Sequence, residues 1–263
     1  MQELRCFEDM MGRKVEIAFP PKRIISLVPS QTELLFDVGL NEEVIGITKF
    51  CTHPKEWLGK KTKVGGTKKL NLDTIKELKP DLIIANKEEN AQAEIEELAK
   101  YFPVWISDIK TIEDACVMIQ QVANMVDKKE IAFSLNKEIK RGFSAIIPST
   151  QALSVAYLIW KNPWMTVGKD TFIHDVIHQI GWHNVYDTQQ RYPETTIERL
   201  QKLNPDLILL SSEPYPFTAK HINELQGHFP QTKILLVDGE MFSWYGSRLK
   251  YAANYLQQLL HSI

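Results

Sequence analysis

The chain has 263 residues, of which 44% are hydrophobic and 24% charged, a balance that is typical of globular domains and excludes a disordered or fibrous protein. Its 31 Lys and Arg residues and 33 Asp and Glu residues give a net charge of −2, which indicates neither a nucleic-acid-binding protein nor a membrane-surface protein. At about 150 residues per domain, we expect one large domain or two smaller ones.

Targeting and redox signals are sparse. The apolar runs at 154–160 and 207–210 are far shorter than the ~20 residues of a membrane span. Three scattered cysteines (Cys6, Cys51, Cys116) exclude a disulfide framework and a zinc ribbon. The N-terminus lacks the ~7–15-residue apolar core of a secretory signal, so we expect either a cytoplasmic protein or a targeting segment outside this sequence.

The first part of the chain follows a strand–helix alternation. Residues 1–22 form a lead-in whose alternation at 15–19 suits an edge strand. β-Branched apolar runs predict buried parallel strands with helices between them, at 24–28, 44–47, 82–85 and 104–106. Ser30 and Glu33 form a capping-box pattern, which predicts a helix from Ser30 to Gly39. We therefore predict an N-terminal α/β lobe over 23–110.

A long helical pattern follows over 111–141. Neither glycine nor proline occurs between Pro103 and Gly142, and apolar residues recur at helical spacing after a cap at Thr111. One continuous helix here would span about 45 Å at ~1.5 Å per residue. We expect it to bridge two lobes as a rigid spacer, with a kink near Asp127–Lys129. The alternative is a pair of ordinary helices.

The strand–helix pattern restarts over 142–263, the predicted C-terminal α/β lobe. Strands are expected at 154–160, 207–210 and 234–237, with helices over 170–180 and 247–260. Residues 72–84 match 197–209 at a constant offset of 125 residues, and each copy reads as a short helix, a Pro-Asp turn and a buried strand. The predicted fold is α/β, with two Rossmann-like lobes bridged by a long rigid helix and a ligand cleft between them.

Catalytic and metal-binding motifs are few. The sequence contains no GxGxxG, GxxxxGK[ST], GxSxG or HExxH motif, and Gly65–Lys69 is best interpreted as a solvated turn. His174 and His178 share one helix face, and Cys51 and His53 offer further donors, but no third ligand is identifiable beside the two histidines. We therefore predict no metal site formed by protein ligands and no catalytic residues.

Aromatic residues gather where strands end. They do not form helical stripes, and in open α/β sheets ligands bind outside the carboxyl ends of the strands. An aromatic side chain there offers a large flat contact face, although about half of such residues are expected to pack loops onto the core. The candidates are Trp160, Trp164, Tyr192, Phe242, Trp244 and Tyr245.

Three segments, at 23–34, 71–84 and 162–169, resemble the class III periplasmic substrate-binding proteins, the helical-backbone metal receptors. Within this family the chain is most similar to the cobalamin receptors of vitamin-uptake ABC importers, over roughly residues 20–260. The resemblance implies a bilobed receptor that closes only modestly on its ligand.

The resemblance also implies two sets of site residues. Asp73 and Glu198, at matched places in the repeat, would pair with arginines of the membrane permease. The ligand would meet positions matching Phe50, Thr67 and Tyr192 and the loop 240–248, and Thr67 and Tyr192 stand where cobalamin receptors have tryptophan. Together with arginines suited to carboxylates, the expected ligand-binding residues are Phe50, Thr67, Trp160, Trp164, Arg191, Tyr192, Phe242, Trp244 and Arg248.

The expected function is that of a substrate-binding component of an ABC importer, which is not an enzyme. It would carry cobalamin, haem or an iron–siderophore as cargo, without a permanent cofactor, and deliver it to a permease dimer. We expect a monomer without a nucleic-acid partner, placed outside the cytoplasm by the resemblance. Two alternatives remain: a two-lobed α/β enzyme acting on a nucleotide-sized substrate, and a cytoplasmic corrinoid- or metal-trafficking protein.

Overall fold

The computed structural model describes residues 3–148 and 151–263. The chain folds into two compact units. Unit 1 comprises Met1–Ile109, Glu113–Glu138 and Tyr245–Arg248, and unit 2 comprises Lys110–Ile112, Ile139–Trp244 and Leu249–Ile263. The segment Tyr245–Arg248 therefore belongs to unit 1, although it lies near the end of the chain. Sequence position alone had placed it in the C-terminal lobe.

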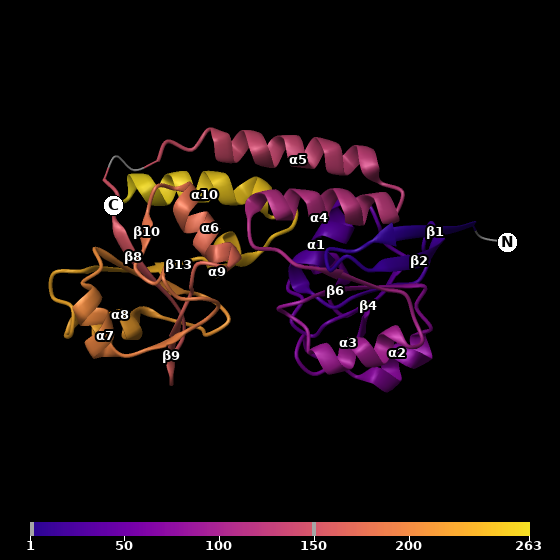
Figure 1. The fold of residues 1–263 in the computed structure, drawn as a ribbon, viewed down its shortest axis with the longest axis horizontal. Helices are drawn as coiled ribbons and strands as arrows, with labels where there is room; N and C mark the ends of the chain where they lie inside the picture. The colour runs from indigo at the N-terminus through magenta and orange to yellow at the C-terminus, as the bar shows by residue number, and fades with distance from the viewer. Residues whose placement is uncertain (1–2, 149–150) are drawn as a thin grey trace. The chain divides into compact units, whose positions relative to one another are not determined.

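Unit 1 is built on a parallel sheet with the strand order β5-β4-β3-β6-β7. Its strands are β3 (Ile24–Ser26), β4 (Val44–Ile47), β5 (Thr62–Lys63), β6 (Leu82–Asn86) and β7 (Val104–Ser107). The helical segments around it are α1 (Pro29–Asp37), η1 (Lys55–Trp57), α2 (Leu72–Leu78) and α3 (Gln92–Ala99). Figure 1 shows α2 and α3 on one face of this sheet and α1 on the other. The four predicted strands are confirmed to within two residues at each end.

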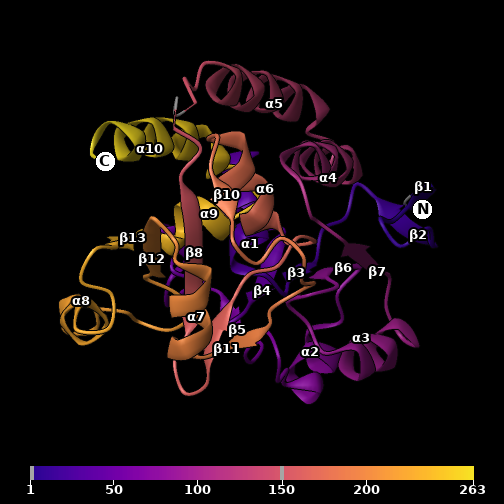
Figure 2. The same ribbon diagram turned by 60° about the vertical axis from the view of Figure 1, so that its left-hand side comes forward.

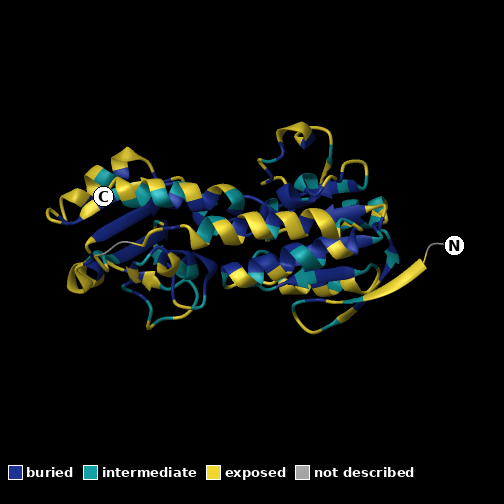
Figure 3. Cartoon of the chain, turned by 90° about the horizontal axis from the view of Figure 1, so that it is seen from above, coloured by how far each residue is buried: buried dark blue, intermediate teal, exposed yellow. Residues whose placement is uncertain are grey.

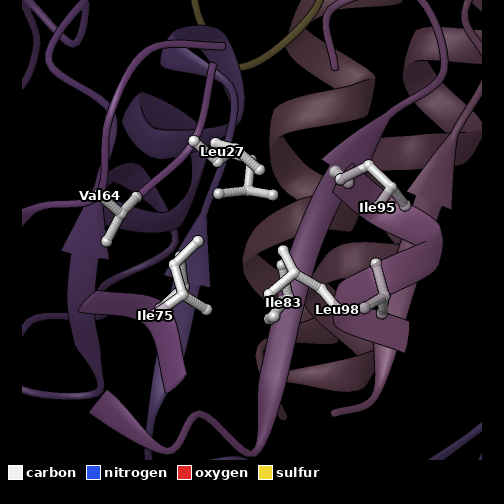
Figure 4. Packing of buried hydrophobic residues seen from close by; sticks show 10 residues of the cluster. Leu27, Val64, Ile75, Ile83, Ile95 and Leu98 are labelled. Carbon is white, nitrogen blue, oxygen red and sulfur yellow. The ribbon is translucent and has the colours of Figure 1, made fainter. Parts of the chain in front are cut away.

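The core of unit 1 lies between the sheet and the helices α2 and α3. Figure 4 shows Ile83 of β6 between Ile75 of α2 and Leu98 of α3, and Val64 and Leu27 belong to the same cluster. Each buried side chain of this size contributes roughly 1.5–3 kcal/mol to the free energy of folding. Val64 is the residue before the Gly65 turn, so the core anchors a loop at the carboxyl edge of the sheet.

The start of α1 differs from its prediction. The N-cap is Val28, Pro29 takes the first helical position, and no side chain caps the helix. Ser30 and Glu33 lie inside the helix and are buried, so the expected capping box is wrong. The pattern misled because the Glu33 carboxylate is bonded to an arginine from a distant part of the chain.

The lead-in is a separate antiparallel hairpin of β1 (Glu3–Glu8) and β2 (Lys14–Phe19). In β2 the apolar residues Val15, Ile17 and Phe19 are buried in alternation, whereas nearly all of β1 is exposed. Figure 3 shows this exposed strand directly after the N-terminus.

The single helix predicted over 111–141 is corrected to two helices, α4 (Ile112–Met125) and α5 (Lys129–Ser144). Asp127 adopts a left-handed conformation, with φ of 60°, and the Lys128 N–H donates to the Ala123 carbonyl. This pattern is a Schellman-type helix end, which aspartate tolerates better than most residues other than glycine. The predicted kink is therefore a complete break. Within the described residues, no helix is both long and apolar enough to cross a membrane.

Unit 2 has a mixed sheet with the order β11-β9-β8-β12-β13, in which β8, β12 and β13 are parallel and β10 also pairs with β8. The strands are β8 (Ser154–Trp160), β9 (Trp164–Thr166), β10 (His183–Asn184), β11 (Glu194–Thr195), β12 (Leu207–Ser211) and β13 (Lys233–Val237). The helices are α6 (Phe172–Gln179), α7 (Ile197–Leu203), α8 (Ala219–Gln226), α9 (Gly239–Ser243) and α10 (Leu249–His261). In Figure 2, α7 and α8 lie on one side of these strands and α6 and α10 on the other.

The internal repeat is confirmed element by element. Helix α2 leads into β6 as α7 leads into β12, at the same offset of 125 residues. Asn71 and Thr196 cap the two helices by accepting the backbone N–H three residues later. Lys79 and Asn204 end them in the left-handed conformation, with φ of 45° and 46°. The α/β fold predicted from the sequence is therefore present in both units.

Candidate ligand-binding site

In unit 1, an exposed aromatic ring lies just beyond the carboxyl end of β4. Phe50 is 54% exposed, and its ring packs over Gly66. The Lys49 backbone N–H donates to the Gly65 carbonyl at 2.8 Å, which fixes the ring on the neighbouring turn. Thr67 is half-buried in the same turn, and its carbonyl accepts from the Asn90 side chain at 3.1 Å. The structure thus brings the predicted residues Phe50 and Thr67 together.

The turn itself is rigid. Gly65 has φ of 102°, and a Cβ atom there would lie 2.6 Å from the Lys69 carbonyl, so only glycine fits without strain. The Gly66 N–H donates to that carbonyl at 2.8 Å, and Gly65 pairs with Leu70. The segment Gly65–Lys69 is therefore a closed turn.

In unit 2, the predicted residues Trp160 and Trp164 lie in one aromatic cluster. Trp160, at the end of β8, is 39% exposed and meets the Tyr215 ring edge-on at 5.6 Å. Trp164 is half-buried and stacks on Phe217 with a 6.0 Å centroid distance and a 2° interplanar angle. The Lys161 ammonium lies 5.4 Å from the Trp164 ring centroid. Trp160 therefore keeps an exposed part of its ring, whereas the half-buried Trp164 packs on Phe217.

Sequence reasoning missed Tyr215, Phe217 and His221, which complete this cluster. The His221 ring caps α8, because its Nδ1 accepts the Thr218 N–H at 2.9 Å. That bond requires Nδ1 to be unprotonated, and burial lowers the pKa of the ring. Tyr215 and Phe217 follow the carboxyl end of β12, so the strand-end criterion used for the tryptophans could have found them.

Arg191 and Tyr192 lie in a loop that is held on the segment Gly168–Asp170. The Arg191 N–H donates to Asp170 Oδ1, and its carbonyl accepts the Gly168 N–H at 2.7 Å. Arg191 has φ of 59°, and a Cβ at Gly168 would lie 2.5 Å from the Gln189 carbonyl oxygen. Both predicted side chains are half-buried, and both make further contacts. The loop that carries Arg191 and Tyr192 is therefore held in a fixed position on Gly168–Asp170.

Phe242 and Trp244 are both buried and pack inside the protein. Phe242 is completely buried between the rings of Tyr157 and Tyr255, which leaves it no surface for a ligand. Trp244 is also buried, and its indole N–H donates to Glu213 Oε1 at 2.9 Å. We therefore leave both out of the proposed ligand-binding residues. Aromatic residues after a strand do not reveal from sequence which of them turn inward.

Beside Trp244, the carboxyl ends of β12 and β13 border a cavity of about 590 Å³. Three carboxyl groups line it, those of Glu213, Asp238 and Glu240. Burial, together with the charges of Glu240 and Asp238, raises the pKa of Glu213, while its bond from Ser243 lowers it. Sequence reasoning did not single out this acidic edge.

Arg248 is buried in unit 1 and is not available to a ligand. Its guanidinium donates to both carboxylate oxygens of Glu33, at 2.7 and 2.9 Å. Both side chains are about nine-tenths buried. A cation bound in this way would have to leave Glu33 unpaired in order to meet a carboxylate of the cargo, which is costly.

Asp73 and Glu198 occupy matched positions, each the second residue of its helix, and both are exposed. The Thr196 hydroxyl donates to the Glu198 carboxylate and holds the pKa of that group below its ordinary value. Each carboxylate also suits the positive end of its helix. The structure thus presents one exposed acidic group at the same place in each unit.

The candidate metal ligands are dispersed. His174 Nδ1 lies 3.2 Å from the Asn184 amide nitrogen, and burial lowers the pKa of the ring. Cys51 is buried in unit 1 and bonds to Thr32. Across residues 3–148 and 151–263, no three His, Cys, Asp or Glu side chains gather in a way that could hold a metal ion.

Comparisons with known proteins agree with this architecture. Residues 24–233 match the periplasmic binding protein family. The chain is 30% identical over 213 residues to YvrC of Bacillus subtilis, an uncharacterized ABC transporter substrate-binding lipoprotein, covering 77% of this chain and 67% of YvrC. It is 27% identical over 219 residues to the vitamin B12-binding protein of Vibrio parahaemolyticus, covering 81% of this chain and 76% of that protein.

A solved structure has a similar fold. The periplasmic haem-binding protein RhuT from Roseiflexus, in its apo form, superposes with a TM-score of 0.79 at 20% identity, covering 92% of this chain and 98% of RhuT. The family match extends from β3, the first strand of the parallel sheet of unit 1, to the start of β13 in unit 2, and so includes both copies of the repeat. The chain therefore belongs to the periplasmic binding protein family.

Proposed function

We propose that the chain is the substrate-binding component of an ABC importer and that it works outside the cytoplasm. Membership of the periplasmic binding protein family carries this proposal. The relative YvrC is named as an ABC transporter substrate-binding lipoprotein, and another relative as a vitamin B12-binding protein. Such a component binds its cargo and passes it to a permease without altering it.

The cargo we propose is a flat metal chelate, of the cobalamin or haem type. Phe50 and Trp160 support this choice, because each presents an exposed ring at a strand end of its unit. An aromatic face favours stacking on a planar macrocycle, and its burial by the ligand adds hydrophobic stabilisation. Of the residues expected from the sequence, the proposed ligand-binding set keeps Phe50, Thr67, Trp160, Trp164, Arg191 and Tyr192.

Direct titration tests the proposal. Cobalamin, haemin and a ferric siderophore are added separately while the visible spectrum and tryptophan fluorescence are followed. At about 100 times its dissociation constant, a true ligand should stabilise the fold by about 2.7 kcal/mol. Replacing both Phe50 and Trp160 by alanine should weaken binding about tenfold or more, because each stacked ring contributes roughly 0.5–1.5 kcal/mol beyond the area that it buries.

Phe133 supplies the matched control, since it is an aromatic residue 65% exposed on α5 and remote in sequence from every proposed contact. Phe133→Ala should leave affinity unchanged. Binding of none of the three chelates, or recovery of a chemically altered chelate after long incubation, would refute the proposed function.

A further inference from the structure

The turn beside Phe50 carries an unbalanced positive charge. Lys49, Lys68 and Lys69 are all exposed around it. The Lys68 ammonium donates to the Glu88 carbonyl, whereas Lys49 and Lys69 have no ion-pair partner within the described part of the chain. Directly after this turn, the Glu94 carboxylate accepts the Leu70 N–H at 3.0 Å.

Lys49 is the cation best fixed relative to the ring. Its ammonium lies 5.1 Å from the Phe50 ring centroid. Its Cε lies 3.4 Å from the position that a Cβ of Gly66 would take, so its alkyl stem runs along the backbone that also supports the ring. Packing of this stem reduces the entropy that a free lysine loses on binding an anion.

Arg248, one of the two arginines expected from the sequence to meet carboxylates of the cargo, is bonded to Glu33. We propose that Lys49 takes this role and makes the protein select planar chelates whose rim carries carboxylate groups. A macrocycle stacked on Phe50 would bring its rim substituents beside the ammonium, where a carboxylate gains a charge-assisted hydrogen bond. This inference rests on the proposed function and names the class of cargo.

Haemin and its dimethyl ester test the selection, because they share one ring system and differ in the two carboxylates. The native protein should bind haemin about tenfold more tightly than the ester, as one charge-assisted bond predicts. Lys49→Met should weaken haemin binding about fivefold and ester binding less than twofold, and Lys49→Arg should restore most of the loss. The preference for haemin should shrink at 1 M salt, where the Debye length is about 3 Å.

Lys55→Met is the control, since Lys55 is an exposed lysine of the same unit on η1 and its loss changes the net charge equally. It should leave both affinities unchanged. Equal affinities for haemin and ester, or a Lys49→Met variant that binds haemin normally, would overturn the inference and leave the proposed function intact. So would binding of cobalamin but not haemin. If no chelate binds at all, the proposed function and this inference fail together.

Discussion

The Arg248 guanidinium and the Glu33 carboxylate form a two-pronged ion pair inside unit 1, although 215 positions separate them in the chain. Glu33 lies in the first turns of α1, and Arg248 belongs to the segment Tyr245–Arg248 that joins unit 1. At Gly246 a Cβ would lie 2.6 Å from the Ser30 carbonyl oxygen, so the same segment also packs tightly on α1. This pair fixes the segment Tyr245–Arg248 onto helix α1 within unit 1.

Arg248→Met should lower the free energy of unfolding by about 3–5 kcal/mol at pH 8, because it leaves a buried carboxylate unpaired. Burial raises the pKa of Glu33, and the bond from Arg248 opposes this effect. In the variant, Glu33 therefore binds a proton more tightly in the folded state than in the unfolded state. Stability falls as pH rises from the ordinary pKa of glutamate through the raised pKa of Glu33. Urea unfolding at pH 5 and pH 8 should show the smaller deficit at pH 5.

Glu33→Gln combined with Arg248→Met provides the control, since it removes both charges. It should recover most of the lost stability and have little pH dependence of its own. A double variant as unstable as Arg248→Met would mean that packing of the arginine stem, and not the charge, explains the loss.

Gly168→Ala should disturb the loop that carries Arg191 and Tyr192. A Cβ there would lie 2.5 Å from the Gln189 carbonyl oxygen, so the loop must move. We expect a stability loss of about 1–3 kcal/mol, as for other overpacked sites. Chelate affinity should fall by a larger factor than in a variant of equal stability elsewhere.

Gly227→Ala is the matched substitution, because the nearest atom to a Cβ at Gly227 lies at an ordinary 3.8 Å and the backbone there is helical. It should preserve both stability and affinity. Loss of affinity in both variants would show that the effect is not specific to the Tyr192 loop.

Asp206→Asn should make stability less dependent on acid pH. The Ser154 hydroxyl and N–H both donate to Asp206 Oδ2, and these bonds lower the pKa of Asp206. Its stabilising contribution is therefore present above the ordinary pKa of aspartate and is lost as pH falls through the lowered value. Because the site is exposed to solvent, we expect the variant to lose only about 1 kcal/mol at pH 7.

Thermal unfolding between pH 2 and pH 7 measures this effect. Ser154→Ala removes one of the two donors and should give an intermediate curve. A pH profile of Asp206→Asn that parallels the native one would rule out this carboxylate as a source of the acid dependence.

Replacing both Asp73 and Glu198 by lysine should impair delivery and not binding. Each side chain is exposed at the start of its repeat helix, and we propose that they dock two equivalent permease subunits. Exposed interface charges act mainly on encounter and orientation. Chelate affinity should stay within about threefold, while transport by the reconstituted importer falls sharply and recovers little with added cargo.

The pair Glu56→Lys and Glu130→Lys changes the net charge equally at exposed acidic positions outside the repeat. It should transport normally. If the Asp73 and Glu198 variant loses chelate affinity and still docks, these residues belong to the cargo site.

The sequence by itself determined the elements whose stability is local. The strands at 44–47 and 154–160 have the predicted bounds, because β-branched apolar runs between turn residues leave few alternatives. The repeat at an offset of 125 residues was visible in the same way, and both copies form the same helix, turn and strand. Trp160 was singled out because strand ends can be read from the pattern, whereas Phe50 was implied only by the resemblance to the receptor family.

Only the tertiary structure decided which polar and aromatic groups turn inward. Ser30 and Glu33 have the spacing of a capping box, but a partner 215 residues away takes the carboxylate into the interior. Phe242 and Trp160 both follow strands, yet one is buried by Tyr157 and Tyr255 while the other keeps an exposed face. Burial depends on contacts made by residues distant in the chain, and spacing along a single sequence carries no record of them.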